Sequence, residues 1–212
     1  MMVRPAEFLC ATSPGTIPRG KHDRGGASVA ADRHTWTIQL LDIQPEDRLL
    51  EVGCGHGVAV SLACERLDGG HILAIDRSEK MIALARRRNQ QWIDAGRASF
   101  QAAESATACL GSGRFDKIFA INVAAFWRFP APELAAVRPA LVPGGALYIV
   151  HQPPAPGKER ASTEALRGLL PARGYRIHAI PTADLEPAPA VCVVAVPDDS
   201  LPAHELDETV GT

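Results

Sequence analysis

The stretch LLEVGCGHG, residues 49–57, decides the fold of this chain. A short apolar run over residues 48–52 leads directly into a turn with glycine at every second position. Glycine lets the backbone turn tightly and approach a ligand, and a helix that follows such a turn presents free N–H groups to it. The apolar residues from Val58 to Leu67 have helical spacing and supply that helix. The stretch therefore predicts a strand, a nucleotide-cofactor loop and a helix.

An acidic residue closes the next predicted strand. Residues 71–75 form an apolar run that ends at Asp76, and Ser78 offers an N-cap hydroxyl to the helix that follows. A doubly wound fold places such a carboxylate where it can accept hydrogen bonds from both ribose hydroxyls. The alternative is that Asp76 only begins a turn and that the glycines only connect two elements. The glycine loop and the acid together favour the cofactor interpretation.

The remaining periodicity predicts an α/β fold. Further strands are expected at residues 98–101, 116–121, 146–150, 175–180 and 191–196, and further helices at 29–43, 78–88, 131–140 and 160–173. Pro143-Gly144-Gly145 predicts a type II turn before the fifth strand. The last two strands are joined by a Pro-rich segment without helical character, which favours an antiparallel pair. We expect a seven-stranded, mostly parallel Rossmann-like sheet with helices on both faces and an antiparallel last strand.

The composition indicates which partners to expect. A chain of 212 residues that is 46% hydrophobic suits one domain. Its 22 Lys and Arg nearly balance 24 Asp and Glu, and the formal charge of -2 predicts no attraction to nucleic acid or to anionic membranes. The five cysteines form neither a CxxC pair nor a zinc-ligand spacing, so we expect reduced thiols and no metal site. The chain shows no signal peptide or membrane-spanning stretch, which predicts a cytoplasmic protein.

The same reading divides the chain into three parts. Residues 11–28 are rich in Gly, Pro, Ser, Lys and Arg and poor in apolar side chains, so we expect residues 1–28 to be a flexible leader, which could also act as a lid. Residues 29–197 form the cofactor-binding domain, and residues 198–212 are expected to be a disordered tail.

The glycine spacing distinguishes between two classes of cofactor. A dinucleotide fingerprint requires GxGxxG, but its third glycine would fall on Val58 or Val60, which disfavours an NAD(P)-dependent oxidoreductase. Glu51 followed by GxGxG at residues 53–57 instead resembles the first motif of the class I S-adenosylmethionine-dependent methyltransferases. The resemblance covers residues 30–196. It implies a single, small Rossmann-like domain that transfers a methyl group from S-adenosylmethionine and releases S-adenosylhomocysteine.

The resemblance also implies a set of cofactor-binding residues: Glu51, Gly53, Cys54, Gly55, Gly57, Asp76, Arg77, Met81, Glu104, Ser105 and Asn122. The glycine loop would contact the methionine part of the cofactor, and Asp76 would bind the ribose. Arg77 and Met81 would flank the adenine, whose amino group would donate to Glu104. Asn122, at the end of the fourth strand, would lie beside the methyl donor.

The acceptor is not identified by these motifs. Phe126, Trp127 and His34 are expected to line its pocket, because aromatic walls stack flat substrates and exclude water. His151 is the candidate general base, and the alternative is a solvated loop histidine. We expect a small-molecule acceptor methylated at oxygen, nitrogen or carbon. A homodimer is one way to complete an open site.

Three other functions remain open at this point. A methyltransferase-like protein can bind S-adenosylmethionine and catalyse a cyclisation or another rearrangement. A non-catalytic binding protein would also keep the fold. The oxidoreductase is further disfavoured because neither Tyr148 nor Tyr175 is followed by the lysine of a Tyr-x-x-x-Lys proton relay. Residues 122–125 lack the Asn-Pro-Pro-Tyr type of motif found in nucleobase aminomethyltransferases.

Overall fold

The computed structural model describes residues 30–112, 114–128, 130–157 and 159–198. The predicted leader and, apart from Asp198, the predicted tail lie outside the described residues. The strands are β1 (Arg48–Val52), β2 (His71–Asp76), β3 (Ala98–Ala102), β4 (Phe115–Ile121), β5 (Leu141–His151), β6 (Tyr175–Ala179), β7 (Thr182–Ala183) and β8 (Ala190–Pro197). The helices are α1 (Ala30–Leu40), α2 (Val58–Cys64), α3 (Glu79–Arg88), α4 (Gln90–Asp94), α5 (Ala125–Arg128), α6 (Pro130–Val137), the 3-10 turn η1 (Arg138–Ala140) and α7 (Glu159–Ala172).

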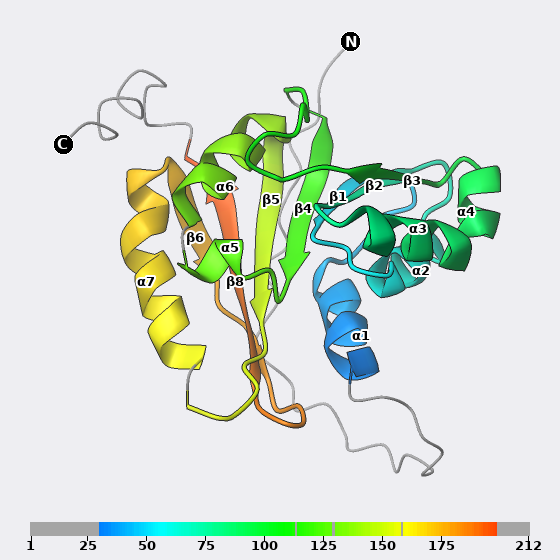
Figure 1. The fold of residues 1–212 in the computed structure, drawn as a ribbon. Helices are drawn as coiled ribbons and strands as arrows, with labels where there is room; N and C mark the ends of the chain where they lie inside the picture. The colour runs from blue at the N-terminus through cyan, green and yellow to red at the C-terminus, as the bar shows by residue number, and fades with distance from the viewer. Residues whose placement is uncertain (1–29, 113, 129, 158, 199–212) are drawn as a thin grey trace.

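The strands form one sheet in the order β3-β2-β1-β4-β5-β8-β6 (Figure 1). Neighbours from β3 to β5 are parallel, whereas β8 runs antiparallel to both β5 and β6. The predicted mostly parallel sheet with an antiparallel last strand is confirmed. The two-residue strand β7, which pairs with β8, was not predicted.

The order of the strands creates a switch point between β1 and β4. From β1 the chain runs outward to β2 and β3, and then returns to place β4 on the other side of β1, with Leu49 opposite Lys117. In open α/β sheets, ligands bind beyond the carboxyl ends of the strands at such a point. The fold therefore predicts a ligand site at the residues that follow Val52 in β1 and Ile121 in β4.

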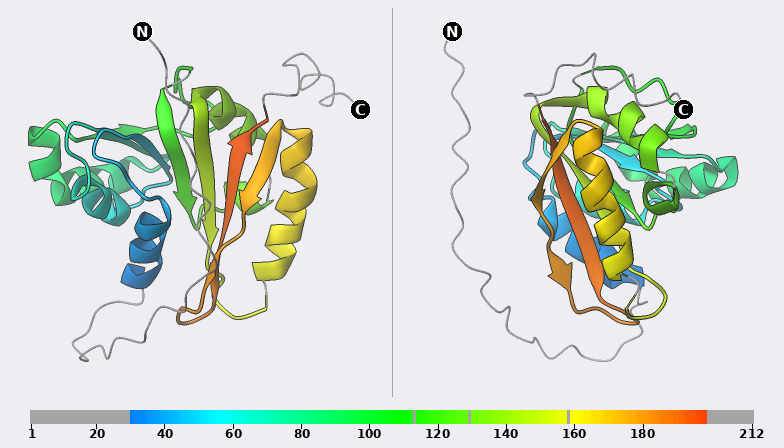
Figure 2. Two further views of the ribbon diagram at one scale, coloured as in Figure 1. Left: turned by 180° about the vertical axis from the view of Figure 1, so that it is seen from behind. Right: turned by 90° about the vertical axis from the view of Figure 1, so that its left-hand side faces the viewer.

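Helices cover both faces of the sheet, as predicted. Helices α1, α2 and α3 pack on the face that receives Leu49, in one core cluster with Val60 of α2. Helices α5, α6 and α7 pack on the opposite face, which receives Leu50, in a second cluster with Leu134 of α6. The right view of Figure 2 shows α1 and α7 on opposite sides of β8. No described helix is both long enough and apolar enough to cross a bilayer.

The Pro143-Gly144-Gly145 segment lies inside β5 and does not precede it. Its residues form an irregularity in the ladder, where the pairing with β4 moves from Phe115 opposite Leu141 to Lys117 opposite Ala146. Gly144 has the positive φ of 80° that the turn prediction required. The local conformation was therefore predicted, but the strand that continues through it was not.

A buried asparagine at the end of α3 ties that helix to the start of α2. The Asn89 amide nitrogen donates to the carbonyls of Gly57 and Ala85 at 3.0 and 2.9 Å, and its Oδ1 accepts from Ser61 Oγ at 2.7 Å. Its side chain is fully buried. A Cβ on Gly57 would lie 2.6 Å from the Asn89 amide nitrogen, so this close approach requires glycine. Asn89 thus fixes the last glycine of the loop against α3.

We expect Asn89→Ala to lower the free energy of unfolding by about 2 to 4 kcal/mol, because it removes three hydrogen bonds inside the core. Urea denaturation measures this change. The exposed neighbour Gln90 provides the control, and Gln90→Ala should stay within about 0.5 kcal/mol of the wild type. Equal unfolding curves for Asn89→Ala and the wild type would contradict the role of Asn89.

Candidate active site

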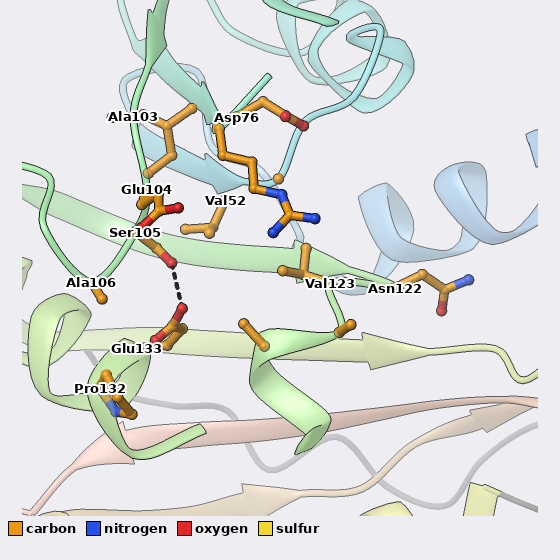
Figure 3. A pocket seen from close by; sticks show the side chains of 15 residues that line it. Val52, Asp76, Ala103, Glu104, Ser105, Ala106, Asn122, Val123, Pro132 and Glu133 are labelled. Carbon is orange, nitrogen blue, oxygen red and sulfur yellow. Dashed lines mark hydrogen bonds between the residues drawn. The ribbon is translucent and has the colours of Figure 1, made fainter. Parts of the chain in front are cut away.

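A cavity of about 570 Å³ opens at the carboxyl edge of the sheet (Figure 3). Its walls come from the segments that follow β1, β2, β3 and β4, and from helix α6. Six of the predicted site residues meet there: Gly53, Asp76, Arg77, Glu104, Ser105 and Asn122. The switch point of the fold therefore carries the cavity, as the rule for open α/β sheets requires.

The glycine loop after β1 is held against the end of β2. The N–H groups of Gly53 and Cys54 both donate to the carbonyl of Ile75, at 2.8 and 3.0 Å. All three glycines of the loop have positive φ, between 53° and 74°. A Cβ on Gly53 would lie 2.5 Å from Val123 Cγ2, so glycine lets the loop pass directly against the segment after β4.

Asp76 connects the loop to helix α3. Its Oδ2 accepts from the Gly55 N–H and its Oδ1 accepts from the Ser78 N–H, both at 2.9 Å. Ser78 in turn caps α3 as predicted, by accepting from the N–H of Met81 at 3.3 Å. A carboxylate has about four acceptor positions, so each oxygen of Asp76 can accept one more hydrogen bond from a ligand in the cavity.

Glu51 is buried beneath the loop. Its side chain is 3% exposed, and its Oε2 makes no hydrogen bond to the described residues. Burial, together with repulsion from Asp76, raises the pKa of Glu51 to about 8. A buried polar atom without a partner is costly, so the position favours a ligand that supplies a donor or a positive charge.

Cys54 is a packed residue of the loop. Its thiol is buried and lies 3.7 Å from the carbonyl oxygen of Gly55. Burial, with Glu51 and Asp76 nearby, holds the pKa of the Cys54 thiol far above its ordinary range. A thiol that does not ionise is a poor nucleophile and metal ligand. Within the described residues, no three His, Cys, Asp or Glu side chains are grouped so that they could hold a metal ion.

The segment after β3 meets helix α6 across the cavity. Ser105 Oγ donates to Glu133 Oε1 at 3.1 Å, and Glu104 lines the cavity beside them (Figure 3). Glu133 was not predicted as a site residue, because it lies in a helix expected only to cover the sheet. Its sequence carries no local signal for this contact, which depends on how α6 packs.

Asn122 joins the end of β4 to the end of β5. It has a positive φ of 55°, and its side chain bonds both backbone groups of Gln152: Nδ2 donates to the carbonyl at 3.2 Å, and Oδ1 accepts from the N–H at 2.7 Å. Asparagine tolerates this backbone region better than most residues. Asn122 therefore holds the ends of β4 and β5 together and also lines the cavity.

The remaining predicted residues lie outside the cavity lining. Met81 is half-buried on α3, and His34 is half-buried on α1. Phe126 is fully buried in the core, so it packs against the sheet instead of forming a pocket wall. The rings of Trp127 and His151 contact each other, with centroids 4.6 Å apart and planes tilted by 40°. These two side chains form one aromatic cluster near the end of β5.

Known proteins resemble both the sequence and the fold. A family model described as "Methyltransferase domain" matches residues 50–147. The uncharacterized methyltransferase YdaC of Bacillus subtilis is 29% identical over 178 residues, which cover 80% of this chain and 96% of the relative. The structure of a SAM-dependent methyltransferase from Aquifex aeolicus has a TM-score of 0.63 at 19% identity and covers 76% of this chain and 88% of its own. The chain belongs to the class I S-adenosylmethionine-dependent methyltransferases.

Another relative of this methyltransferase is named as an O-methyltransferase. Nocamycin O-methyltransferase of Saccharothrix syringae is 31% identical over 134 residues, which cover 61% of this chain and 46% of the relative. The family makes S-adenosylmethionine the cosubstrate of the methyltransferase.

The residues of the methyltransferase fit that cosubstrate. A cavity of about 570 Å³ is within the usual range for a ligand of this size. The Glu51 carboxyl, which has an oxygen without a hydrogen-bond partner among the described residues, is suited to a ligand with a positive charge. Asp76 can accept hydrogen bonds from neighbouring hydroxyl groups.

The raised pKa of Glu51 predicts how the stability of the cofactor-free methyltransferase depends on pH. Glu51 ionises near pH 4.5 in the unfolded chain but near pH 8 in the folded protein, so stability is lost as the pH rises between these values. Glu51→Gln removes this loss. At pH 7.5 we expect the variant to be more stable than the wild type by about 1 to 3 kcal/mol, with little difference near pH 4.5. Urea denaturation at both pH values checks this, and a constant difference across the range would contradict it.

Gly55 and Gly96 provide a matched pair for the loop. Both have positive φ, and a Cβ on either would meet no atom within 4 Å, but only Gly55 lies in the glycine loop. Gly55→Ala and Gly96→Ala should therefore each cost about 1 kcal/mol in backbone strain. We expect only Gly55→Ala to weaken S-adenosylmethionine binding, by about tenfold or more, as measured by calorimetry. Equal affinities in the two variants would show that the ligand does not approach Gly55.

Proposed function

We propose that the methyltransferase acts on a small-molecule acceptor bound beyond the carboxyl ends of β4 and β5. The observation that carries the proposal is the cavity that joins the glycine loop, Asp76 and Asn122 at the switch point. The relative named nocamycin O-methyltransferase supports an acceptor of this size class. The formal net charge of -2 gives the chain no overall attraction to nucleic acid.

In this proposal the cofactor lies across the strands from β1 to β3. Glu51 and the loop of residues 53–57 take its methionine part, and Asp76 takes the ribose. Arg77 and Glu104, which both line the cavity, take the adenine, and Glu104 lies beside Ser105 (Figure 3). This order places the reactive methyl group near Asn122, which is also where the ends of β4 and β5 are joined.

Bound S-adenosylmethionine supplies a methyl group that its positively charged sulfur already activates. The chain therefore needs to align the acceptor and exclude water, and it needs no covalent intermediate. The Trp127 ring offers an apolar wall for a flat acceptor, and it packs against His151. We propose that His151 accepts the proton of a hydroxyl or ammonium acceptor, since imidazole is the side chain best suited to proton transfer near neutral pH.

Calorimetric titration tests the cofactor assignment without knowledge of the acceptor. We expect S-adenosylmethionine and S-adenosylhomocysteine to bind with dissociation constants of roughly micromolar size, and NAD and NADP to give no saturable heat. Binding of the nicotinamide cofactors in place of the first pair would overturn it.

Transfer of labelled methyl groups tests the acceptor class. The methyltransferase is incubated with labelled S-adenosylmethionine and either the small-molecule fraction or the desalted macromolecular fraction of a cell extract. We expect label to enter the small-molecule fraction. Label found only in nucleic acid or protein would refute the proposed acceptor, while leaving the methyltransferase assignment intact. His151→Ala should lower the rate of transfer without lowering the affinity for S-adenosylhomocysteine.

A further inference from the structure

Arg33 on α1 is a half-buried cation with no counter-charge among the described residues. Its Nη1 donates to Gln152 Oε1 at 3.3 Å, and its buried Nε makes no hydrogen bond to this part of the chain. None of the ion pairs among the described residues includes Arg33. A partly buried charge without an opposite charge is less favourable than a paired one, so an anion bound beside Arg33 would be stabilising.

Local helix electrostatics do not account for Arg33 either. The residue lies in the first turn of α1, where the helix dipole favours negative charge. Asp32 is adjacent in sequence, but consecutive residues of a helix point in different directions, and Asp32 is exposed. An anion brought by a ligand would satisfy both the guanidinium and the helix terminus beside it.

Gln152 places the guanidinium at the edge of the proposed active site. Its Nε2 donates to the carbonyls of Glu186 and Ala188, both at 2.9 Å, which leaves its Oε1 directed at Arg33. The backbone of Gln152 is bound by Asn122, which lines the cavity. Gln152 is 5% exposed, so this arrangement is built into the core and does not depend on a mobile surface chain.

We propose that Arg33 binds an anionic group of the acceptor, a carboxylate or a phosphate. The inference rests on the proposed function, in which the acceptor lies at the ends of β4 and β5. The guanidinium offers a fork of N–H donors that matches either anion. Its Nε has no hydrogen-bond partner among the described residues, so this donor is not already used.

The position of Arg33 favours the acceptor over the carboxylate of the cofactor. The cavity assigned to the cofactor is lined by the segments after β1, β2, β3 and β4. Arg33 instead contacts Gln152 after β5, one strand further along the sheet. In the proposed binding mode, the methyl donor lies on the β1 side of Asn122 and Arg33 lies on the β5 side.

Binding of simple anions to the protein saturated with S-adenosylhomocysteine tests the inference. The probes are benzoate, its neutral analogue benzamide, and inorganic phosphate, each titrated by calorimetry. We expect benzoate or phosphate to bind saturably and benzamide about tenfold or more weakly. Arg33→Met should lose about tenfold or more of the anion affinity, and Arg33→Lys should keep part of it. Arg167→Met, which removes an exposed arginine of α7, is the matched control and should leave anion binding unchanged.

Three results would overturn the inference. They are anion binding that Arg33→Met leaves unchanged, equal binding of benzoate and benzamide, and no saturable anion binding to the wild type. The cofactor also has a carboxylate that Arg33 could bind. Titration with S-adenosylhomocysteine and with 5′-methylthioadenosine, which lacks the amino-acid part, distinguishes this role from binding of the acceptor. If Arg33→Met weakens only the ligand with the amino-acid part, Arg33 binds the cofactor and the acceptor role is wrong. If the wild type binds neither ligand, the proposed function itself fails.

Discussion

The hydrogen bonds from the backbone to Asp76 are the constraint on which the site depends. One carboxylate accepts from Gly55 in the loop after β1 and from Ser78 at the start of α3. Without Asp76, the N–H groups of Gly55 and Ser78 would lose these hydrogen-bond partners. Because Asp76 lies at the end of β2, the parallel pairing of β1 and β2 fixes where the loop can sit. Asn89 repeats the link one turn further on, where it binds Gly57 from the end of α3. The loop is thereby shaped before any ligand arrives, which lowers the entropy that binding must overcome.

The sequence predicted the parts of the fold that periodicity and glycine chemistry determine. The strand at residues 48–52, the loop and the capped helix after Ser78 all follow from short-range patterns, and the structure has them. The short helices α4 and α5 were missed because five and four residues are too few to show a helical period. The first helix was expected to reach residue 43 but ends at Leu40, where no glycine or proline marks the boundary.

The site was predictable where it lies on strand ends and not where it depends on packing. Asp76 ends a strand, and Glu104 and Asn122 each follow one, so the parallel sheet alone brings them to one edge. Glu133 reaches the same cavity from α6, and only the packing of that helix decides this. Packing also moves a predicted residue out of the site. Phe126 follows Ala125, which lines the cavity, but its own side chain is buried in the core. Helix phase, which a four-residue segment does not reveal, separates Phe126 from its neighbour Trp127.

Two ionisable groups of opposite type flank the active site. Glu51 under the glycine loop has an oxygen without a partner among the described residues, and it suits a positively charged methyl donor. Arg33, near the end of β5, is a cation that forms no ion pair with the described residues. Asn122 follows β4, the strand between β1 and β5, and is hydrogen-bonded to Gln152 after β5. A site of this kind would orient the reactants by charge as well as by shape. An acceptor whose anion is held by Arg33 would present its other end toward Asn122, and the bound methyl donor would then meet a nucleophile already directed at it.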